Sequence, residues 1–231
     1  VITRWEIEQS PAATVIDLIQ SEPGIEIGRN GGPGTVSSIF MRGQASKNVA
    51  VFIDGVRLQT DALGAVLYNN IPLSQIERIE ILRGNMSALY GSSAVCGAIH
   101  IFTKSGNTAD TFKTQVTYGS RHTQELGLSF HGNYDDVSYT LSLNDYSTEN
   151  ESAINPLQKP TTDADIDPYR NTVINSRVEW TPTTNRKLGI NVSKSSGKVN
   201  YDGTYYVGTI AHNDGNFYAN QESDSLIIYG T

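Results

Sequence analysis

Through its second half the chain places an apolar residue at every second position, and this pattern limits its possible folds more than any other. The run at residues 137–144, VSYTLSLN, is one example, and similar runs recur to the end of the sequence. Successive side chains of a β-strand point to opposite faces, so each run predicts a strand with one apolar and one polar face. We count about six such strands between residues 107 and 231.

The connections between these strands alternate in length. Short turns are predicted at 119–121, 132–134 and 182–185, whereas residues 147–170 and 198–222 are long and polar. Outer-membrane barrels have short turns at one end and long loops at the other, with aromatic girdles near the strand ends. The aromatic candidates are Tyr118, Tyr134, Tyr146, Trp180 and Tyr229. A soluble antiparallel sandwich alternates in the same way, so the pattern leaves both folds open.

Composition excludes several classes of protein. With 17 Lys and Arg against 24 Asp and Glu the net charge is −7, so the chain has no basic field to hold nucleic acid. The longest apolar run, residues 49–53, is far shorter than the roughly 18–20 residues of a membrane helix. Any membrane role must therefore be built from strands. The four histidines are scattered and no activated nucleophile or phosphate loop is present, which favours binding or transport over an enzyme.

The first half, residues 1–106, mixes helix and strand signals. Ser10-Pro11 predicts the start of a helix that ends before Pro23-Gly24. Residues 49–53 predict a buried strand, and Asp54-Gly55 predicts a two-residue hairpin turn after it. A helical turn at 72–75, a strand at 76–82, a short turn at 86–90 and a buried strand at 98–102 complete a small α+β domain.

Several segments of this half resemble the plug domain of TonB-dependent outer-membrane receptors. They are residues 48–57 (NVAVFIDGVR), 76–84 (IERIEILRG), 87–92 (SALYGS) and 97–104 (GAIHIFTK). Pro23-Gly24-Ile25 and residues 30–43 are most similar to the cobalamin-receptor branch of that family. The resemblance implies an α+β plug domain over 1–106, followed over 107–231 by antiparallel transmembrane β-barrel strands. Plugged barrels have about 22 strands, so only part of the barrel is expected here, without the N-terminal segment that pairs with TonB.

The sequence departs from this family pattern at three positions. Asn85, Cys96 and His100 stand where Pro, a small residue and Asn are usual. Cys96 is the single cysteine, so no intrachain disulfide forms, and we expect it to be a small buried residue. A metal site at Cys96 and His100 is a minor alternative, because two ligands do not close a site.

The function implied by the resemblance is high-affinity, TonB-dependent uptake of cobalamin or a related corrinoid across the bacterial outer membrane. A receptor for a siderophore or another metal chelate is the alternative within the same family. A soluble β-sandwich binding or adhesion module is the alternative of a different class. The expected partners are TonB, outer-membrane lipid and the ligand.

Two loops of the plug are expected to face the ligand. Glycines in residues 30–37 let the backbone approach a large ligand closely, and the second loop, residues 59–70, is long enough to be functional. Ordinary turn-rich connections are the other interpretation. By resemblance the substrate-binding residues are Asn30, Pro33, Gly34, Thr35, Val36, Asp61, Gly64, Leu67, Tyr68 and Asn69.

Carboxylates alternate along the first long polar stretch, at Asp163, Asp165 and Asp167. Such a pattern converges oxygen atoms on a hard cation, and Ca²⁺ takes 6 to 8 oxygen ligands, although a solvated acidic loop has the same composition. Cobalamin receptors bind calcium in these loops. The resemblance implies the Ca²⁺ ligands Asp163, Asp165, Tyr201 and Asp202, with Glu151 and Asp214 as further candidates.

Arg42 and Arg83 each precede a glycine after an apolar strand. By resemblance they latch the plug against carboxylates of the barrel wall, because a buried arginine without a partner is costly. An ordinary surface salt bridge is the alternative.

Overall fold

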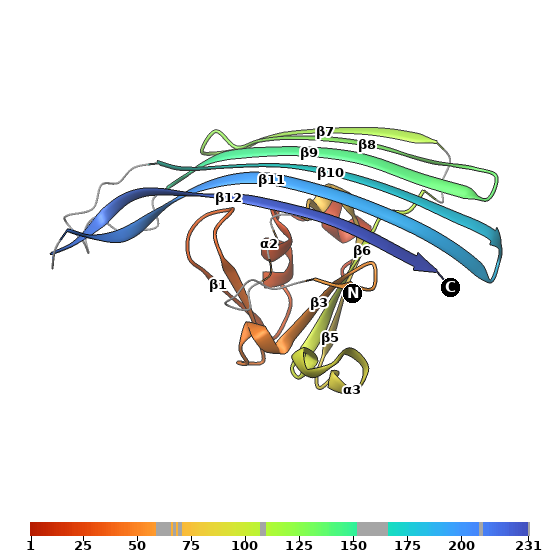
Figure 1. Cartoon of the computed structure of the whole chain (residues 1–231), viewed down its shortest axis with the longest axis horizontal. Helices are drawn as coiled ribbons and strands as arrows, with labels where there is room; N and C mark the ends of the chain where they lie inside the picture. The colour runs from red at the N-terminus through yellow and green to blue at the C-terminus, as the bar shows by residue number, and fades with distance from the viewer. Residues whose placement is uncertain are drawn as a thin grey trace. The chain divides into compact units, whose positions relative to one another are not determined.

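The computed structural model describes residues 1–58, 66, 68, 71–106, 110–151, 166–207 and 210–230, with only the backbone described at 151, 202–207 and 210–216. These residues form two compact units (Figure 1). Unit 1 comprises Val1–Arg29 and Val36–Ser105, and unit 2 comprises Asn30–Thr35 and Gly106–Thr231. Among the described residues, no helix is long and apolar enough to cross a membrane.

Unit 1 combines short helices with two small sheets. Strands β1 (Ile25–Arg29) and β2 (Ser37–Met41) form an antiparallel pair. A four-stranded sheet has the order β4-β3-β6-β5, in which β3 and β6 run parallel and the other neighbours antiparallel. The remaining elements are α1 (Arg4–Gln9), α2 (Val15–Gln20), η1 (Ser46–Asn48), β3 (Val49–Ile53), β4 (Val56–Arg57), η3 (Leu73–Gln75), β5 (Ile76–Arg83), α3 (Ser87–Tyr90), η4 (Ser92–Ala94) and β6 (Gly97–Thr103).

Capping residues fix where α1 and α2 begin. α2 starts at Val15, later than predicted, because Thr14 is its N-cap: the Thr14 hydroxyl accepts from the backbone N–H of Asp17 at 3.2 Å, and the Asp17 carboxylate accepts from that of Thr14 at 2.9 Å. This reciprocal pair is a capping box. α1, which the sequence analysis missed, starts with the same box between Thr3 and Glu6. Both helices have six residues, too few for a clear helical period.

Asp17 also carries an ion pair that joins α2 to β1. Its carboxylate lies 2.5 Å from the Arg29 guanidinium. Burial acts to raise the pKa of Asp17, but the hydrogen bonds from Arg29 and Thr14 outweigh burial and hold this pKa below its usual value. The charged form of Asp17 therefore stabilises this corner of unit 1.

The predicted strands of unit 1 are confirmed, and they enclose an isoleucine-rich core. Asp54 and Gly55 both have positive φ, 48° and 83°, as the predicted two-residue hairpin between β3 and β4 requires. One face of the four-stranded sheet packs with α2 and β2 in a core that includes Val15, Ile19, Ile39, Met41, Ile76, Ile79, Ile99 and Ile101. A smaller cluster of Ala50, Phe52, Ala94 and Ala98 lies on the other face.

Unit 2 is one curved six-stranded antiparallel sheet (Figure 1) in the order β12-β11-β10-β9-β8-β7. The predicted number of strands is confirmed. Their bounds are β7 (Thr111–Tyr118), β8 (Gln124–Tyr134), β9 (Val137–Glu151), β10 (Ile166–Thr183), β11 (Arg186–Val207) and β12 (Ile210–Gly230). The turns at 135–136 and 184–185 share one end of the sheet. The other end holds the turn at 119–123 and the strand termini Glu151, Ile166, Val207 and Ile210.

Some predicted connections were wrong. Residues 198–222 belong largely to β11 and β12, which stay paired from Lys198↔Asn220 to Gly203↔Gly215. The sequence of this range lacks the apolar alternation that marks the other strands, so the pattern did not predict them. The turn predicted at 132–134 falls at Asp135-Asp136, where Asp135 has φ 49°.

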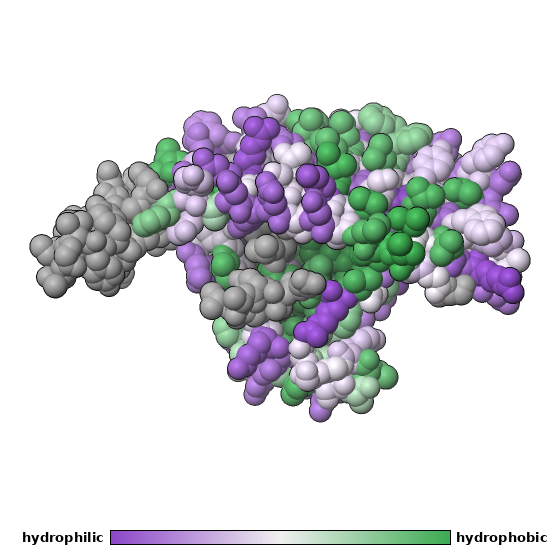
Figure 2. All heavy atoms as spheres, in the orientation of Figure 1, coloured by the Kyte–Doolittle hydropathy of each residue, from purple (hydrophilic) through white to green (hydrophobic). Residues whose placement is uncertain are grey.

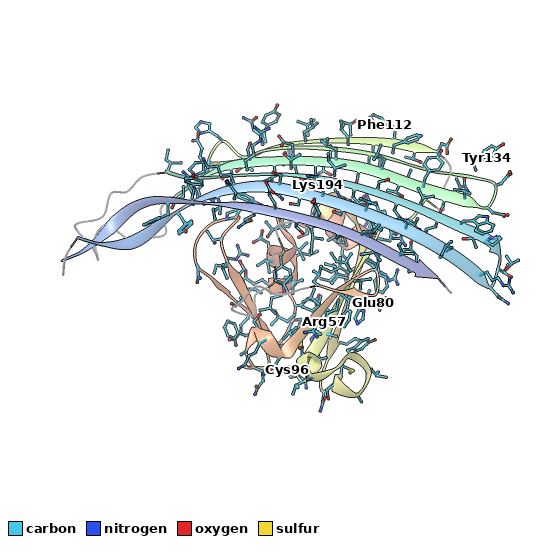
Figure 3. All side chains as sticks on the ribbon, in the orientation of Figure 1. Arg57, Glu80, Cys96, Phe112, Tyr134 and Lys194 are labelled. Carbon is cyan, nitrogen blue, oxygen red and sulfur yellow. The ribbon has the colours of Figure 1, made fainter. Side chains whose placement is uncertain are left out.

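The two faces of the unit 2 sheet have the polarity of a membrane-spanning wall. Apolar side chains are exposed on one face, among them Phe112 at 65%, Trp180 at 50% and Ile228 at 65%. Figure 2 shows apolar residues gathered over the strands, and Figure 3 shows Phe112 projecting away from the sheet. The opposite face buries polar side chains, which include Ser142, Asn144, Asn171, Asn175, Glu179, Asn191 and Ser195. A soluble sandwich buries its apolar face instead, so the structure favours the transmembrane barrel.

Three of the five predicted girdle aromatics lie on the apolar face. Tyr118, Tyr134 and Trp180 are exposed there. The other two assignments were wrong, because Tyr146 packs against Tyr169 on the polar face and Tyr229 bonds to Glu179 on that same face.

Candidate functional site

The Asn30–Thr35 segment connects β1 to β2 and forms a closed turn. Both the backbone N–H and the hydroxyl of Thr35 donate to the carbonyl of Gly32, at 3.2 Å and 2.7 Å. Gly34 has φ 91°, a conformation that side-chain-bearing residues rarely adopt. The segment therefore has a defined backbone conformation rather than being an open glycine-rich loop.

Three strands of unit 2 contact this segment. The Asn150 amide donates to the Pro33 carbonyl at 3.0 Å, and the Gln221 amide donates to the Gly34 carbonyl at 2.8 Å. A Cβ atom at Gly34 would overlap the ring of Tyr169. The sequence analysis predicts ligand contact for these glycines, and that stays a prediction. In the structure the lack of a side chain at Gly34 makes room for the Tyr169 ring.

The predicted substrate-binding residues have different environments. In the first loop Asn30 is exposed, Pro33, Thr35 and Val36 are half-buried, and Gly34 is buried. In the second loop Tyr68 is only 3% exposed and packs in the unit 1 core, where burial raises its pKa. The predicted contact of Tyr68 with ligand stays a prediction. The other predicted residues of that loop lie outside the described residues: Asp61, Gly64, Leu67 and Asn69.

Most of the predicted calcium ligands have no described side chain. Asp163 and Asp165 lie there, and only the backbone is described at Glu151, Asp202 and Asp214. Tyr201 is exposed, with its ring stacked on Phe217 at a centroid separation of 6.0 Å. In the part of the chain that is described, no group of three or more His, Cys, Asp or Glu side chains lies together to hold a metal ion. The calcium site stays a prediction.

A charged cluster on the polar face of the sheet was missed by the sequence analysis. Glu179, 1% exposed, lies near the end that carries the short turns. Its carboxylate accepts from the Tyr229 hydroxyl at 2.7 Å, Arg177 at 2.9 Å and Lys187 at 3.3 Å. The Tyr229 ring lies over Gly189, where a Cβ atom would overlap it. Arg177 and Glu179 are two positions apart on one strand, so their side chains share a face. This pair of opposite charges was the signal from which the sequence could have predicted the cluster.

The two predicted latch arginines differ in their surroundings. Arg83 donates to Glu22 at 2.7 Å within unit 1. Arg42 is exposed and has φ 53°, an uncommon value for a residue with a side chain. Their predicted role as latches to the barrel wall stays a prediction.

Cys96 and His100 do not come together. Cys96 is 7% exposed and packs in the main core, as expected, whereas His100 stacks on Phe52 at 4.6 Å on the other face of the sheet. Burial lowers the pKa of His100, and the nearby Glu80 carboxylate acts in the opposite direction. The two side chains therefore do not form the alternative metal pair.

The fold defines a class of protein: a small α+β domain joined to membrane-facing barrel strands. Comparison with known proteins shows what the chain resembles. Residues 1–98 match the family described as TonB-dependent Receptor Plug Domain. This part of the chain is therefore similar to the plug domain of TonB-dependent receptors.

Two curated relatives carry the name Vitamin B12 transporter BtuB. The protein from Vibrio cholerae serotype O1 (strain ATCC 39541 / Classical Ogawa 395 / O395) is 41% identical over 129 residues, which are 56% of this chain and 21% of that one. The protein from Vibrio vulnificus (strain YJ016) is 38% identical over 136 residues, 59% of this chain and 22% of that one. The aligned part of this chain thus spans about a fifth of the length of these relatives.

Solved structures share the fold at lower identity. The siderophore receptor PirA from Acinetobacter baumannii has a TM-score of 0.69 and 26% identity, over 87% of this chain and 31% of that one. The ferric yersiniabactin uptake receptor FyuA from Yersinia pestis has a TM-score of 0.79 and 21% identity, over 99% of this chain and 37% of that one.

Proposed function

We propose that this chain supplies the plug and first barrel strands of a receptor that takes up cobalamin or a related corrinoid. The observation that carries the proposal is the identity of about 40% to relatives named as vitamin B12 transporters. The solved siderophore receptors are 26% identical or less, so their likeness supports the architecture more than the ligand.

The proposed mechanism assigns each face of the sheet a role. The exposed apolar face contacts lipid, and the polar face lines the barrel interior. The end with the longer connections faces outward, and the Asn30–Thr35 segment lies near that end through its contacts with Asn150 and Gln221. Ligand binds there from outside, with Ca²⁺ ordering the outer loops. TonB then acts on the plug, and the energy comes from the inner membrane.

A siderophore or another metal chelate is the second candidate ligand. The 26% identity to PirA over most of this chain supports it. The plug and strand architecture is the same for both ligands, so only a binding measurement separates them.

Equilibrium binding to the full-length receptor in detergent tests the proposal. We expect cyanocobalamin to bind tightly, and ferric enterobactin to bind at least a hundredfold more weakly. The reverse order of affinities would replace the corrinoid by a siderophore. Binding of neither compound would refute both ligand assignments and leave only the family.

A further inference from the structure

We propose that Asn150, Tyr169 and Gln221 are positioning residues that hold the Asn30–Thr35 segment in one backbone conformation for ligand binding. The inference rests on the proposed function, because it concerns the segment expected to contact ligand. The three residues come from β9, β10 and β12, and all contact the same short turn.

The contacts fix consecutive peptide groups. Amide donors from Asn150 and Gln221 hold the carbonyls of Pro33 and Gly34, which are adjacent in sequence. The Tyr169 ring fills the space beside Gly34 that a side chain would otherwise occupy. Two directed hydrogen bonds and one packing contact leave this backbone little freedom to rotate.

The positioning residues are themselves held in place. Asn150 and Tyr169 are 3% and 4% exposed, and the Tyr169 ring packs against Tyr146 with centroids 5.9 Å apart. Loss of the Asn150 bond to the Pro33 carbonyl would leave a buried amide without its partner, which is unfavourable. The sheet therefore acts as a rigid support for the segment.

The arrangement leaves side chains of the segment available to a ligand. The sheet engages backbone carbonyls, while Asn30 is exposed and Thr35 is half-buried. A glycine-rich segment that was free in solution would lose much conformational entropy on ligand binding. Holding it beforehand lowers that cost and tightens binding. One net hydrogen bond corresponds to about a fivefold change in affinity, so loss of both is expected to weaken ligand binding on the order of 25-fold.

Spin-label mobility tests this role without any ligand. A nitroxide is attached at Asn30→Cys in a Cys96→Ala background of the full-length receptor, in detergent. We compare Asn150→Ala/Gln221→Ala with Asn175→Ala, a matched control on the same face whose amide bonds to Asn191 instead. If the alanine pair fails to fold, Asn150→Leu/Gln221→Met keeps the approximate size of both side chains and removes the N–H donors without adding charge.

We expect an immobilised label in the parent and the control, and a mobile component in the double variant. Unchanged label mobility in the double variant would overturn the proposal. Cyanocobalamin affinity is then measured for the double variant and the control in unlabelled receptor that keeps Asn30: weaker binding together with higher mobility supports positioning, whereas weaker binding with unchanged mobility assigns these residues to direct ligand contact and refutes it. If the unlabelled receptor with no substitution binds no cyanocobalamin, the proposed function fails, but the mobility result still decides the positioning role.

Discussion

Replacing Gly189 by alanine perturbs the charged cluster on the polar face of the sheet. The new Cβ atom would overlap the Tyr229 ring, so that ring must move. Its hydroxyl would then lose the bond it donates to Glu179 at 2.7 Å and the bond it accepts from Arg177 at 2.9 Å. The Arg177–Glu179 ion pair at 2.9 Å does not involve the ring and should survive.

The magnitude follows from these contacts. A hydrogen bond to a charged group contributes about 1.5–3 kcal/mol, and crowding in a packed site costs about 1–3 kcal/mol. Partial relaxation reduces the sum, so we expect Gly189→Ala to lower the free energy of unfolding by about 2–4 kcal/mol. Equilibrium urea unfolding of the full-length receptor, followed by the heat-dependent migration of the folded barrel on gels, measures this change.

Gly127→Ala is the matched control. Gly127 lies on the same face of the same sheet, but its nearest Cβ neighbour would be Gln115 Cβ at an ordinary 3.5 Å. We expect this substitution to be neutral or to stabilise by up to about 1 kcal/mol, through the unfolded state. Tyr229→Phe removes only the hydroxyl, and its cost should not add fully to that of Gly189→Ala. Equal unfolding free energies for Gly189→Ala and Gly127→Ala would refute the reasoning.

Three further predictions concern other parts of the chain. Asp17→Asn should speed hydrogen exchange of the α2 amides at pH 6. Because folding lowers the pKa of Asp17, the stability that its carboxylate contributes is present above the pKa of the unfolded state and is lost as pH falls through the pKa of the folded state. A difference in exchange rate that persists unchanged well below pH 3 would contradict the assignment. Ile190→Lys, on the apolar face, should lower the free energy of unfolding in lipid by about 2–4 kcal/mol. Ser196→Lys, further along the same face, should have little effect. Equal losses of unfolding free energy in the two variants would argue against a lipid-facing band. Asp163→Ala/Asp165→Ala should weaken cyanocobalamin binding in Ca²⁺ and remove its calcium dependence, and a double variant that retains both would rule out the predicted calcium site.

Much of the fold was predictable because it depends on local patterns. The alternation from residue 107 onward identified strands with one apolar face, and Asp54-Gly55 identified a hairpin. Strand ends were less predictable, because β11 and β12 stay paired through residues 198–222, where the sequence lacks an apolar alternation. The start of α2 depended on the side chain of Thr14, whereas Pro11, three residues earlier, led the sequence analysis to an earlier start.

The candidate site was less accessible from sequence. The glycines of residues 30–35 stood out, but the residues that hold them, Asn150 and Gln221, are 117 and 187 positions away from their partners. Glu179 and Tyr229 likewise meet only through the pairing of three strands. Such contacts follow from strand register, which the sequence pattern does not supply.

Uptake of labelled cyanocobalamin by intact cells that express the full-length receptor tests the central claim most directly. The account predicts accumulation of label in cells with TonB, and only surface binding in matched cells without it. Equal accumulation in both strains, or no binding to either, would contradict a TonB-dependent corrinoid receptor.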